Sequence, residues 1–167
     1  MASLTTYSPK DVTCTIAGIC SVEGYADGEF IRISKNENAV STRRAMDGTQ
    51  SRVYSPDTGW QLQLTLMQSS TTNDLISALW NVDQVTRMGK FPIFIKDGLG
   101  TTMFMAASCW VESPADVVFS NQLETRTWIF ACTEVSVNIG GAGNLGIESA
   151  LGLGSAALPL LKTFGVI

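Results

Sequence analysis

Three carboxylates lie close together around one short turn, and they are the best candidates for acid–base chemistry. Glu23, Asp27 and Glu29 all fall within residues 23–29. A pair of carboxyl groups at a fixed separation is the machinery of glycoside hydrolysis. Asp27, however, precedes Gly28, and Asp-Gly supplies the positive φ angle that a tight turn requires. We therefore interpret these side chains as solvated turn residues and expect the chain not to be an enzyme.

Histidine is absent from the sequence, which removes several classes of active site. Ser-His and Cys-His pairs, histidine-ligated zinc and the imidazole general base are all excluded. The glycine-rich run at residues 140–146 lacks the Lys-Ser/Thr pair of a phosphate-binding loop, and it does not lead into a recognisable β-α-β unit. We expect no nucleotide site and no cofactor.

The cysteines point to packing rather than to metal binding. The chain has four, Cys14, Cys20, Cys109 and Cys132, with no C-x-x-C pair among them. A zinc site made of cysteines alone normally draws its ligands from two such pairs. All four lie among apolar neighbours in predicted strands, so we expect small buried thiols in a reducing compartment and no metal.

The charge balance argues against binding nucleic acid through its phosphates. Charged residues make up 16% of the chain, and eleven basic against fifteen acidic residues give a formal net charge of −4. Phosphate binding needs clustered Lys and Arg. The one local basic excess is Arg43, Arg44 and Arg52. We interpret it either as a solvated loop face or as a site that pairs with carboxylates of a neighbouring subunit.

These residues are carried by segments with the period-two alternation of β-strands. The clearest is Trp60–Gln68, where large apolar residues alternate with Gln61, Gln63 and Thr65. This polar face is uncharged, although Lys and Glu would be expected on a face that meets bulk water. Further strands are predicted over residues 12–22, 30–35, 51–54, 91–96, 101–111, 117–120 and 125–139, with a turn at residues 25–28 before the second of them.

The strand predicted over residues 125–139 changes phase along its length. Trp128, Phe130 and Cys132 share one face, whereas Val135 and Val137 share the other. Either the strand passes from one packing environment to another, or a bulge near Thr133 shifts its register.

One helix is predicted, over Thr72–Met88. A capping-box-like pair, Thr71 and Asp74, opens it, and Gly89 follows as a C′ residue. Helical spacing predicts that the residues anchoring it to the sheet are Leu75, Leu79 and Val82, with Trp80 off this stripe and either exposed or turned toward a partner.

Two segments fall outside the strand and helix patterns. Residues 36–50 contain only Val40 and Met46 as large apolar side chains and are predicted to be a long loop. Loops of this length in compact domains are usually functional or ordered by a partner. Residues 141–167 are glycine-rich and apolar, and we expect them to form an ordered interface arm that packs on a neighbour or on its own barrel.

The expected organisation is a domain over residues 1–140 followed by the arm at 141–167. The domain is predicted to be mainly β: an antiparallel β-barrel or sandwich of about seven or eight strands with one flanking α-helix. No secretory signal is recognised at the N-terminus, and the apolar stretch at 150–161 is too short for a membrane span.

A set of short motifs follows in a defined order along residues 3–141. No single motif is specific, but the ordered set resembles the inner tail tube proteins of contractile-tailed bacteriophages. The glycine-rich extension after Gly141 departs from the compact members of that family. The motifs are Tyr7-Ser8-Pro9-Lys10-Asp11-Val12, Gly24-Tyr25-Ala26-Asp27-Gly28, Ala45-Met46-Asp47-Gly48, Arg52, the strand Trp60–Leu66, and Gln68-Ser69-Ser70-Thr71-Thr72-Asn73-Asp74-Leu75.

The resemblance implies a virion protein, assembled in the host cytoplasm, whose hexameric rings stack into a hollow tube. Its partners would be the contractile tail sheath protein around the tube, the baseplate and tail terminator proteins at its ends, and the tape measure protein and phage DNA in the lumen, without sequence-specific binding. Gln61, Gln63 and Thr65 would face the lumen. Inter-subunit contacts would involve Arg43, Arg44, Met46, Asp47, Arg52, Leu151, Leu158 and Phe164.

Two other functions remain open from the residues. A tail terminator or baseplate ring protein would share the same fold. A small-ligand-binding β-barrel of the cytoplasm would instead be a monomer with an apolar cavity, and it would leave residues 36–50 and 141–167 without a role.

Overall fold

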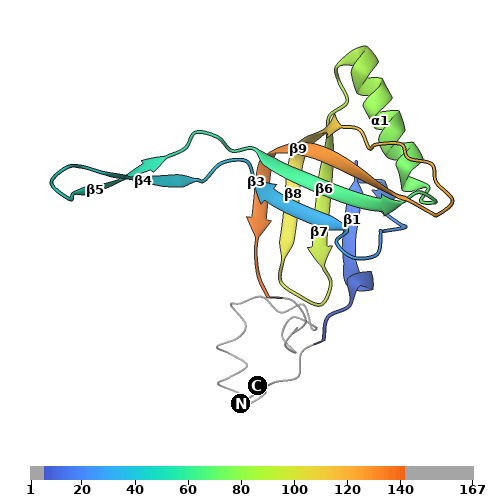
Figure 1. Cartoon of the computed structure of the whole chain (residues 1–167), viewed down its shortest axis with the longest axis horizontal. Coiled ribbons are helices and arrows are strands. Elements are labelled where there is room, and N and C mark those ends of the chain that lie inside the picture. The colour runs from blue at the N-terminus through green and yellow to red at the C-terminus, as the bar shows by residue number, and fades with distance from the viewer. Residues whose placement is uncertain (1–5, 142–167) are drawn as a thin grey trace.

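The computed structural model describes residues 6–141, and all structural statements below concern this part of the chain. It contains nine strands, one α-helix and one short 3-10 helix (Figure 1). The elements are the 3-10 helix Pro9–Asp11, β1 Val12–Ile16, β2 Cys20–Ser21, β3 Ile31–Lys35, β4 Val40–Arg44, β5 Gln50–Tyr54, β6 Trp60–Met67, α1 Thr72–Thr86, β7 Phe91–Asp97, β8 Met103–Ser113 and β9 Thr125–Asn138.

Seven of the strands form one antiparallel sheet in the order β2-β1-β7-β8-β9-β6-β3. The sheet curls so that β3 and β6 cross in front of β1, β7 and β8 in Figure 1, and the ring centroids of Trp60 on β6 and Phe104 on β8 lie 6.2 Å apart. The predicted mainly β architecture with a single helix is therefore confirmed. Strands β4 and β5 form a separate two-stranded hairpin that projects away from this sheet.

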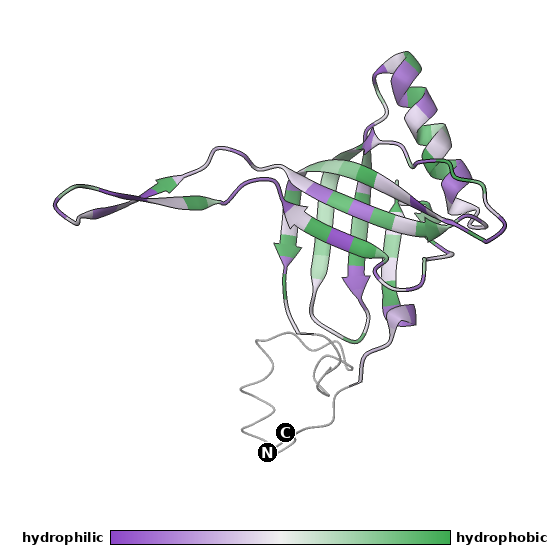
Figure 2. Cartoon of the chain, in the orientation of Figure 1, coloured by the Kyte–Doolittle hydropathy of each residue, from purple (hydrophilic) through white to green (hydrophobic). Residues whose placement is uncertain are grey.

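The core lies inside the curl and is built by the alternation expected from the sequence. Leu62, Leu64 and Leu66 of β6 are fully buried, and Phe130 of β9 and Ile93 of β7 pack in the same cluster. Figure 2 shows the resulting alternation of polar and apolar residues along β3 and β6. Burial of alternate side chains on one face of each strand is the main source of stability for such a sheet.

Three of the four cysteines belong to this core. Cys14, Cys109 and Cys132 are buried, Cys20 is half-buried, and all four are free thiols. Burial raises the pKa of the Cys14 thiol to about 12, with a smaller contribution from the nearby Cys109. The pKa of Cys132 is also raised, mainly by its hydrogen bond with Cys109 and then by burial. The Cys14 and Cys132 thiols are therefore protonated at neutral pH.

The single strand predicted over residues 12–22 is wrong, because the chain turns back in its middle. Ala17 and Gly18 both have positive φ, 57° and 71°, and Ile16 pairs with Cys20 across the turn. Two consecutive residues with positive φ are the signature of a type I′ hairpin turn. Strands β1 and β2 therefore form a hairpin, and the even-numbered apolar positions continue across it by coincidence.

Two other local predictions are also corrected. Residues 36–50 are not a loop throughout, since they contain β4 and its turn to β5. The segment at 117–120 is not a strand, because it lies in an irregular connection between β8 and β9. Strands β2 and β3 occupy the two opposite edges of the main sheet.

The helix begins as predicted at Thr72 but is held differently. Thr71 makes no side-chain capping bond, whereas the Asn73 amide donates to the carbonyls of Met67 and Ser70, and Trp128 Nε1 donates to Asn73 Oδ1 at 2.9 Å. Both Asn73 and Trp128 are buried. The helix start is thus fixed to the ends of β6 and β9 by a buried polar network, which sequence spacing did not indicate.

The helix also presents a different face to the sheet. Ile76 is its one fully buried apolar side chain, Leu79 and Trp80 are half-buried against the core, and Val82 is 52% exposed. The predicted stripe is therefore displaced by about one residue. The helix ends at Thr86, where Arg87 adopts the left-handed conformation. Gly89 is needed further on, because a side chain there would collide with Asp83. Within residues 6–141 no helix has the length and apolar character to cross a bilayer.

The phase change in β9 is confirmed, and β8 changes phase at the same place. Buried positions on β8 are Phe104 and Ala106 before the change and Cys109 and Val111 after it. On β9 the opposing residue Glu134 has a positive φ of 53°. The pairing Ala106–Val135 on one side and Ser108–Thr133 on the other keeps one register. Each strand therefore contains one extra residue at this point. Beyond it, the side of each strand that was exposed becomes the buried side, on both strands at once.

Candidate assembly surfaces

The hairpin of β4 and β5 is the most unusual surface of the described chain. Every residue of both strands is exposed, and the two strands pack mainly against each other (Figure 1). Tyr54 is 68% exposed and Met46, at the tip, is fully exposed. An isolated two-stranded hairpin is marginally stable at best in water. Large apolar side chains on such an element indicate a surface that is covered by a partner.

The tip of this hairpin is a well-formed turn. The Gly48 N–H donates to the Ala45 carbonyl at 3.0 Å, the Ala45 N–H donates to the Thr49 carbonyl at 2.8 Å, and Gly48 has a φ of 90°. The Thr49 N–H also donates to Asp47 Oδ1 at 2.9 Å, which lowers the pKa of the Asp47 carboxyl below its ordinary value. A turn closed by glycine at positive φ is a standard hairpin connection, so the tip defines where the exposed Met46 is presented.

The arginines predicted as one basic site are distributed over both faces of the hairpin. Thr42 pairs with Arg52 and Arg44 pairs with Gln50, so Arg44 and Arg52 share a face. Arg43 pairs with Ser51 and lies on the opposite face. The Arg52 guanidinium lies 5.8 Å from the centre of the Tyr54 ring. The hairpin is therefore basic on both sides, in a chain whose net charge is −4.

The second surface is the outer face of β3, β6 and β9, here called the polar face. The register places its residues in rows across the three strands, and they alternate with buried positions. One row is Ser34, Gln61 and Ala131; the next is Arg32, Gln63 and Ile129; the last is the pair Thr65 and Thr127.

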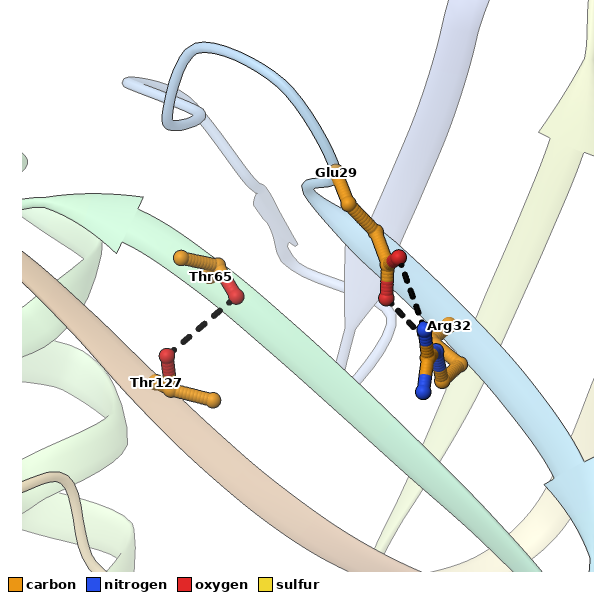
Figure 3. Close-up of polar contacts among 4 residues, drawn as sticks. All are labelled: Glu29, Arg32, Thr65 and Thr127. Carbon is orange, nitrogen blue, oxygen red and sulfur yellow. Dashed lines mark hydrogen bonds and ion pairs between the residues drawn. The ribbon is translucent and has the colours of Figure 1, made fainter.

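The one charge on the polar face is neutralised locally. Arg32 Nε lies 2.6 Å from Glu29 Oε1, and both side chains are largely exposed (Figure 3). Thr65 and Thr127 share a hydrogen bond of 3.3 Å between their hydroxyl oxygens (Figure 3). An exposed ion pair adds little stability, but here it removes the net charge. The predicted uncharged character of Gln61, Gln63 and Thr65 therefore extends over three strands.

The third surface is the connection between β8 and β9, which the sequence did not predict to be a surface of contact. The connection between β8 and β9 carries four exposed apolar side chains, with exposed fractions of 51–78%. They are Val117, Val118, Phe119 and Leu123. The signal was the run at 117–119, which the alternation rule assigned to an edge strand. Exposed apolar clusters of this kind mark interaction sites.

The structure brings the predicted residues together in two separate groups. Arg43, Arg44, Met46, Asp47 and Arg52 all lie on the hairpin, and Gln61, Gln63 and Thr65 lie on the polar face. Leu151, Leu158 and Phe164 lie outside the described residues.

The candidate carboxylates are accounted for by local structure. Glu29 pairs with Arg32, and Glu23 and Asp27 are exposed. In residues 6–141 no three Cys, Asp or Glu side chains gather in a way that would hold a metal ion.

Comparison with known proteins relates the chain to viral and injection-system structures. No family model matches it. The chain is 26% identical over 143 residues to structural protein ORF10 of Pseudomonas phage KPP10, covering 81% of this chain and 83% of that protein.

Two solved structures share its fold. The first is the tube terminating cap of the anti-feeding prophage, with a TM-score of 0.53 and 14% identity over 83% of this chain and 94% of that one. The second is a sheath/tube terminator of an extracellular contractile injection system in its extended state, with a TM-score of 0.56 and 13% identity over 83% of this chain and all of that one. At these identities the likeness concerns the fold alone.

Proposed function

We propose that this chain is a structural, non-enzymatic subunit of a contractile phage tail, which forms a ring around the tube axis. The observation that carries the proposal is the β4–β5 hairpin. It exposes both faces of both strands, bears apolar and basic side chains, and projects from an otherwise acidic chain. An element of this kind fits a contact with the acidic surface of another copy, in which one patch meets a different patch.

Two positions on the tube axis are open to such a ring, and the terminating ring is the better supported. The two solved structures described above are the tube terminating cap of the anti-feeding prophage and a sheath/tube terminator of an extracellular contractile injection system. We therefore place the ring at the end of a tube as the first candidate.

The second candidate is a subunit of the inner tube itself, in which hexameric rings stack and the polar face lines the lumen. The uncharged rows of Gln61 and Gln63, with Arg32 neutralised by Glu29, favour this role. A wall without net positive charge does not retain a passing polyanion. In this arrangement the sheath, tape measure protein and phage DNA would be neighbours of the ring in the virion.

Imaging of the purified full chain separates these candidates. Size-exclusion chromatography with light scattering, followed by negative-stain microscopy over a range of concentrations, is expected to show rings. Single or paired rings at every concentration support the terminator, and long tubes support the tube subunit. A chain that stays monomeric throughout contradicts both, and the ligand-binding barrel would then be the better hypothesis.

A charge insertion tests which face lines the bore. We expect rings of the double variant Gln61→Lys/Gln63→Lys to retain nuclease-protected DNA, whereas unmodified rings do not. The matched control is Asn121→Lys/Gln122→Lys, two exposed positions in the β8–β9 connection, which should retain none. DNA retention by the control to the same extent would show that added charge anywhere suffices and that the polar face does not line the lumen.

A further inference from the structure

The connection between β8 and β9 is acidic as well as apolar. Residues 112–125 contain the carboxylates of Glu112, Asp116 and Glu124 and no lysine or arginine. Glu112 and Asp116 are exposed, and Glu124 is half-buried. None of the three forms an ion pair with another residue of the described chain. Unpaired carboxylates beside exposed apolar side chains favour a partner surface that is both basic and apolar.

A hollow of about 410 Å³ lies between this connection and β9. Asp116 and Glu124 line it together with the apolar Val118, whereas Arg126, the next cation along the chain, and residues 121–122 do not. Pockets that hold a small organic ligand begin at about 300 Å³. The hollow is therefore large enough to receive an aromatic ring or a guanidinium group, and its carboxylates favour a cation.

One face of the β4–β5 hairpin carries side chains of this kind. The guanidinium groups of Arg44 and Arg52 lie on it with the ring of Tyr54, and neither strand contains an aspartate or glutamate. Arginine pairs with carboxylates through two hydrogen bonds and also stacks on aromatic rings. This face is therefore complementary to the hollow. Its members, as the pairing of the two strands places them, are Val40, Thr42, Arg44, Gln50, Arg52 and Tyr54.

The hairpin and the hollow lie at opposite ends of β6. At the start of β6, the Asn36 N–H donates to the Gly59 carbonyl at 3.1 Å and so fixes the base of the hairpin. At its end, the Gln68 N–H donates to the Glu124 carbonyl at 3.0 Å. The eight residues of β6 span about 23 Å at ~3.3 Å per residue. The hairpin moreover projects away from the end of the sheet that carries α1 (Figure 1), so the two surfaces meet only between copies.

We propose that the hairpin face with Arg44, Arg52 and Tyr54 docks into the hollow beside the β8–β9 connection of the next copy in the ring. This inference rests on the proposed function, because it names the surface that receives the hairpin within that ring. Each copy then uses one patch to give and a different patch to receive, and such a head-to-tail contact closes into a ring when its rotation closes. The arginines neutralise Asp116 and Glu124, and Tyr54 covers apolar surface of the connection.

Exchanging the charges of the two surfaces tests the proposal. The hairpin variant Arg44→Glu/Arg52→Glu and the connection variant Asp116→Arg/Glu124→Arg each bring like charges together at every contact. We expect each to raise the protein concentration needed for rings by at least about tenfold in sedimentation velocity. The chain that carries all four substitutions restores opposite charges at the contact, and it should form rings at the concentration of the unmodified chain.

The matched control combines the hairpin variant with Glu23→Arg/Asp27→Arg, the same change of charge at two exposed carboxylates outside the hollow. It should assemble as poorly as the hairpin variant alone. Equal restoration by this control would attribute assembly to net charge and overturn the proposal. If the unmodified chain forms rings and the fourfold variant does not, this inference fails alone; if the unmodified chain forms none, the proposed function fails with it.

A photo-cross-link covers the case in which a charge variant fails to fold. Tyr54 is 68% exposed, so Tyr54→p-benzoylphenylalanine places a probe on the docking face of the otherwise unmodified chain. In a mixture of unlabelled and ¹⁵N-labelled chains, irradiation should join this position to a peptide from residues 112–125 of a differently labelled copy. The same probe at Val53, on the opposite face of the hairpin, should give several-fold less. An equal yield from position 53, or no link to residues 112–125, would overturn the proposal.

Discussion

The buried side chain of Asn73 connects three elements that are distant in sequence. Its amide bonds to the end of β6, and its carbonyl oxygen accepts from the indole of Trp128 on β9. Removing it leaves the buried indole N–H of Trp128 without this partner, and an unpaired buried polar group costs about 1–3 kcal/mol. We expect Asn73→Ala to lower the free energy of unfolding by at least this amount, measured by chemical denaturation of the unassembled chain.

The matched control is Asn81→Ala on the same helix, where the asparagine is exposed. Surface changes of this kind stay within about 0.5 kcal/mol. Equal effects of the two substitutions would show that helix propensity, and not the buried network, sets the stability.

The thiols should differ sharply in reactivity. Cys14, Cys109 and Cys132 are buried, and burial raises the pKa of Cys14, so few thiolates form there. We expect iodoacetamide at pH 8 to label Cys20 first in the native chain and the other three only after unfolding, as followed by peptide mass spectrometry. Early labelling of Cys109 would contradict the packing described for the core.

Ile76 is the main side chain by which α1 packs against the core. Because it is fully buried, we expect Ile76→Ala to cost about 2–5 kcal/mol of unfolding free energy through the lost burial and the cavity left behind. Val82→Ala, at an exposed position of the same helix, should change stability by less than about 0.5 kcal/mol. A larger loss of stability for Val82→Ala than for Ile76→Ala would show that the helix docks through Leu75, Leu79 and Val82, as helical spacing predicted.

The hairpin should govern assembly but not folding. Arg44 and Arg52 share one face, so Arg44→Glu/Arg52→Glu turns that face acidic and makes it repel an acidic partner surface. We expect an unchanged melting temperature for the monomer and a higher protein concentration for ring contacts in sedimentation experiments. Arg43→Glu, on the opposite face, should shift this concentration less if one face makes the contact.

Overall charge is controlled with Lys90→Glu/Lys96→Glu, two exposed lysines at and before β7. Assembly that weakens equally in this control would attribute the effect to net charge. The hairpin arginines would then have no specific role in assembly.

The strands buried on one face were predictable, whereas the exposed strand β4 was not. Leu62 and Gln63 alternate because one face of β6 meets the core, and that alternation is written in the sequence. Strand β4 meets solvent on both faces, so residues such as Arg43 and Arg44 give it no period-two signal, and the sequence predicts a loop there. The turn at Ala17 was hidden because apolar positions continue across it.

For the candidate surfaces, too, one part could be predicted from the sequence and another part could not. The uncharged Gln61, Gln63 and Thr65 could be recognised from composition alone, since the expected lysines and glutamates are missing. That Arg43 and Arg44 face opposite sides, and that Arg32 is neutralised by Glu29, depends on pairing and three-dimensional proximity. Neither relation is encoded in spacing.

For the molecule as a whole, stability should be nearly independent of pH around neutrality and should fall in alkali. The sequence contains no histidine, so no imidazole titrates between pH 5.5 and 7.5. An unfolded cysteine loses its proton near pH 8.5, whereas the pKa of Cys14 in the fold is raised to about 12. Above the unfolded pKa the unfolded chain binds fewer protons, so rising pH favours unfolding until the folded thiol also ionises.

Denaturation with a reducing agent at a series of pH values measures this profile. We expect a plateau from about pH 5.5 to 7.5 and a decline that begins near pH 8.5. The variant Cys14→Ala should decline less steeply, whatever its stability at neutral pH. A steep change near pH 6.5 would contradict the profile.

The paired slip in β8 and β9 has an evolutionary consequence. Ala107 and Glu134 are the extra residues of the two strands, and because both are present the pairing on either side stays in one register. Deleting one of them would shift that register and turn half of a strand inside out. Deleting both would keep the pairing and would let buried and exposed side chains alternate without interruption along each strand. Related sequences should therefore gain or lose these two positions together. In an alignment, paired gaps at these two positions, which are distant in sequence, would group the proteins that share a common ancestor.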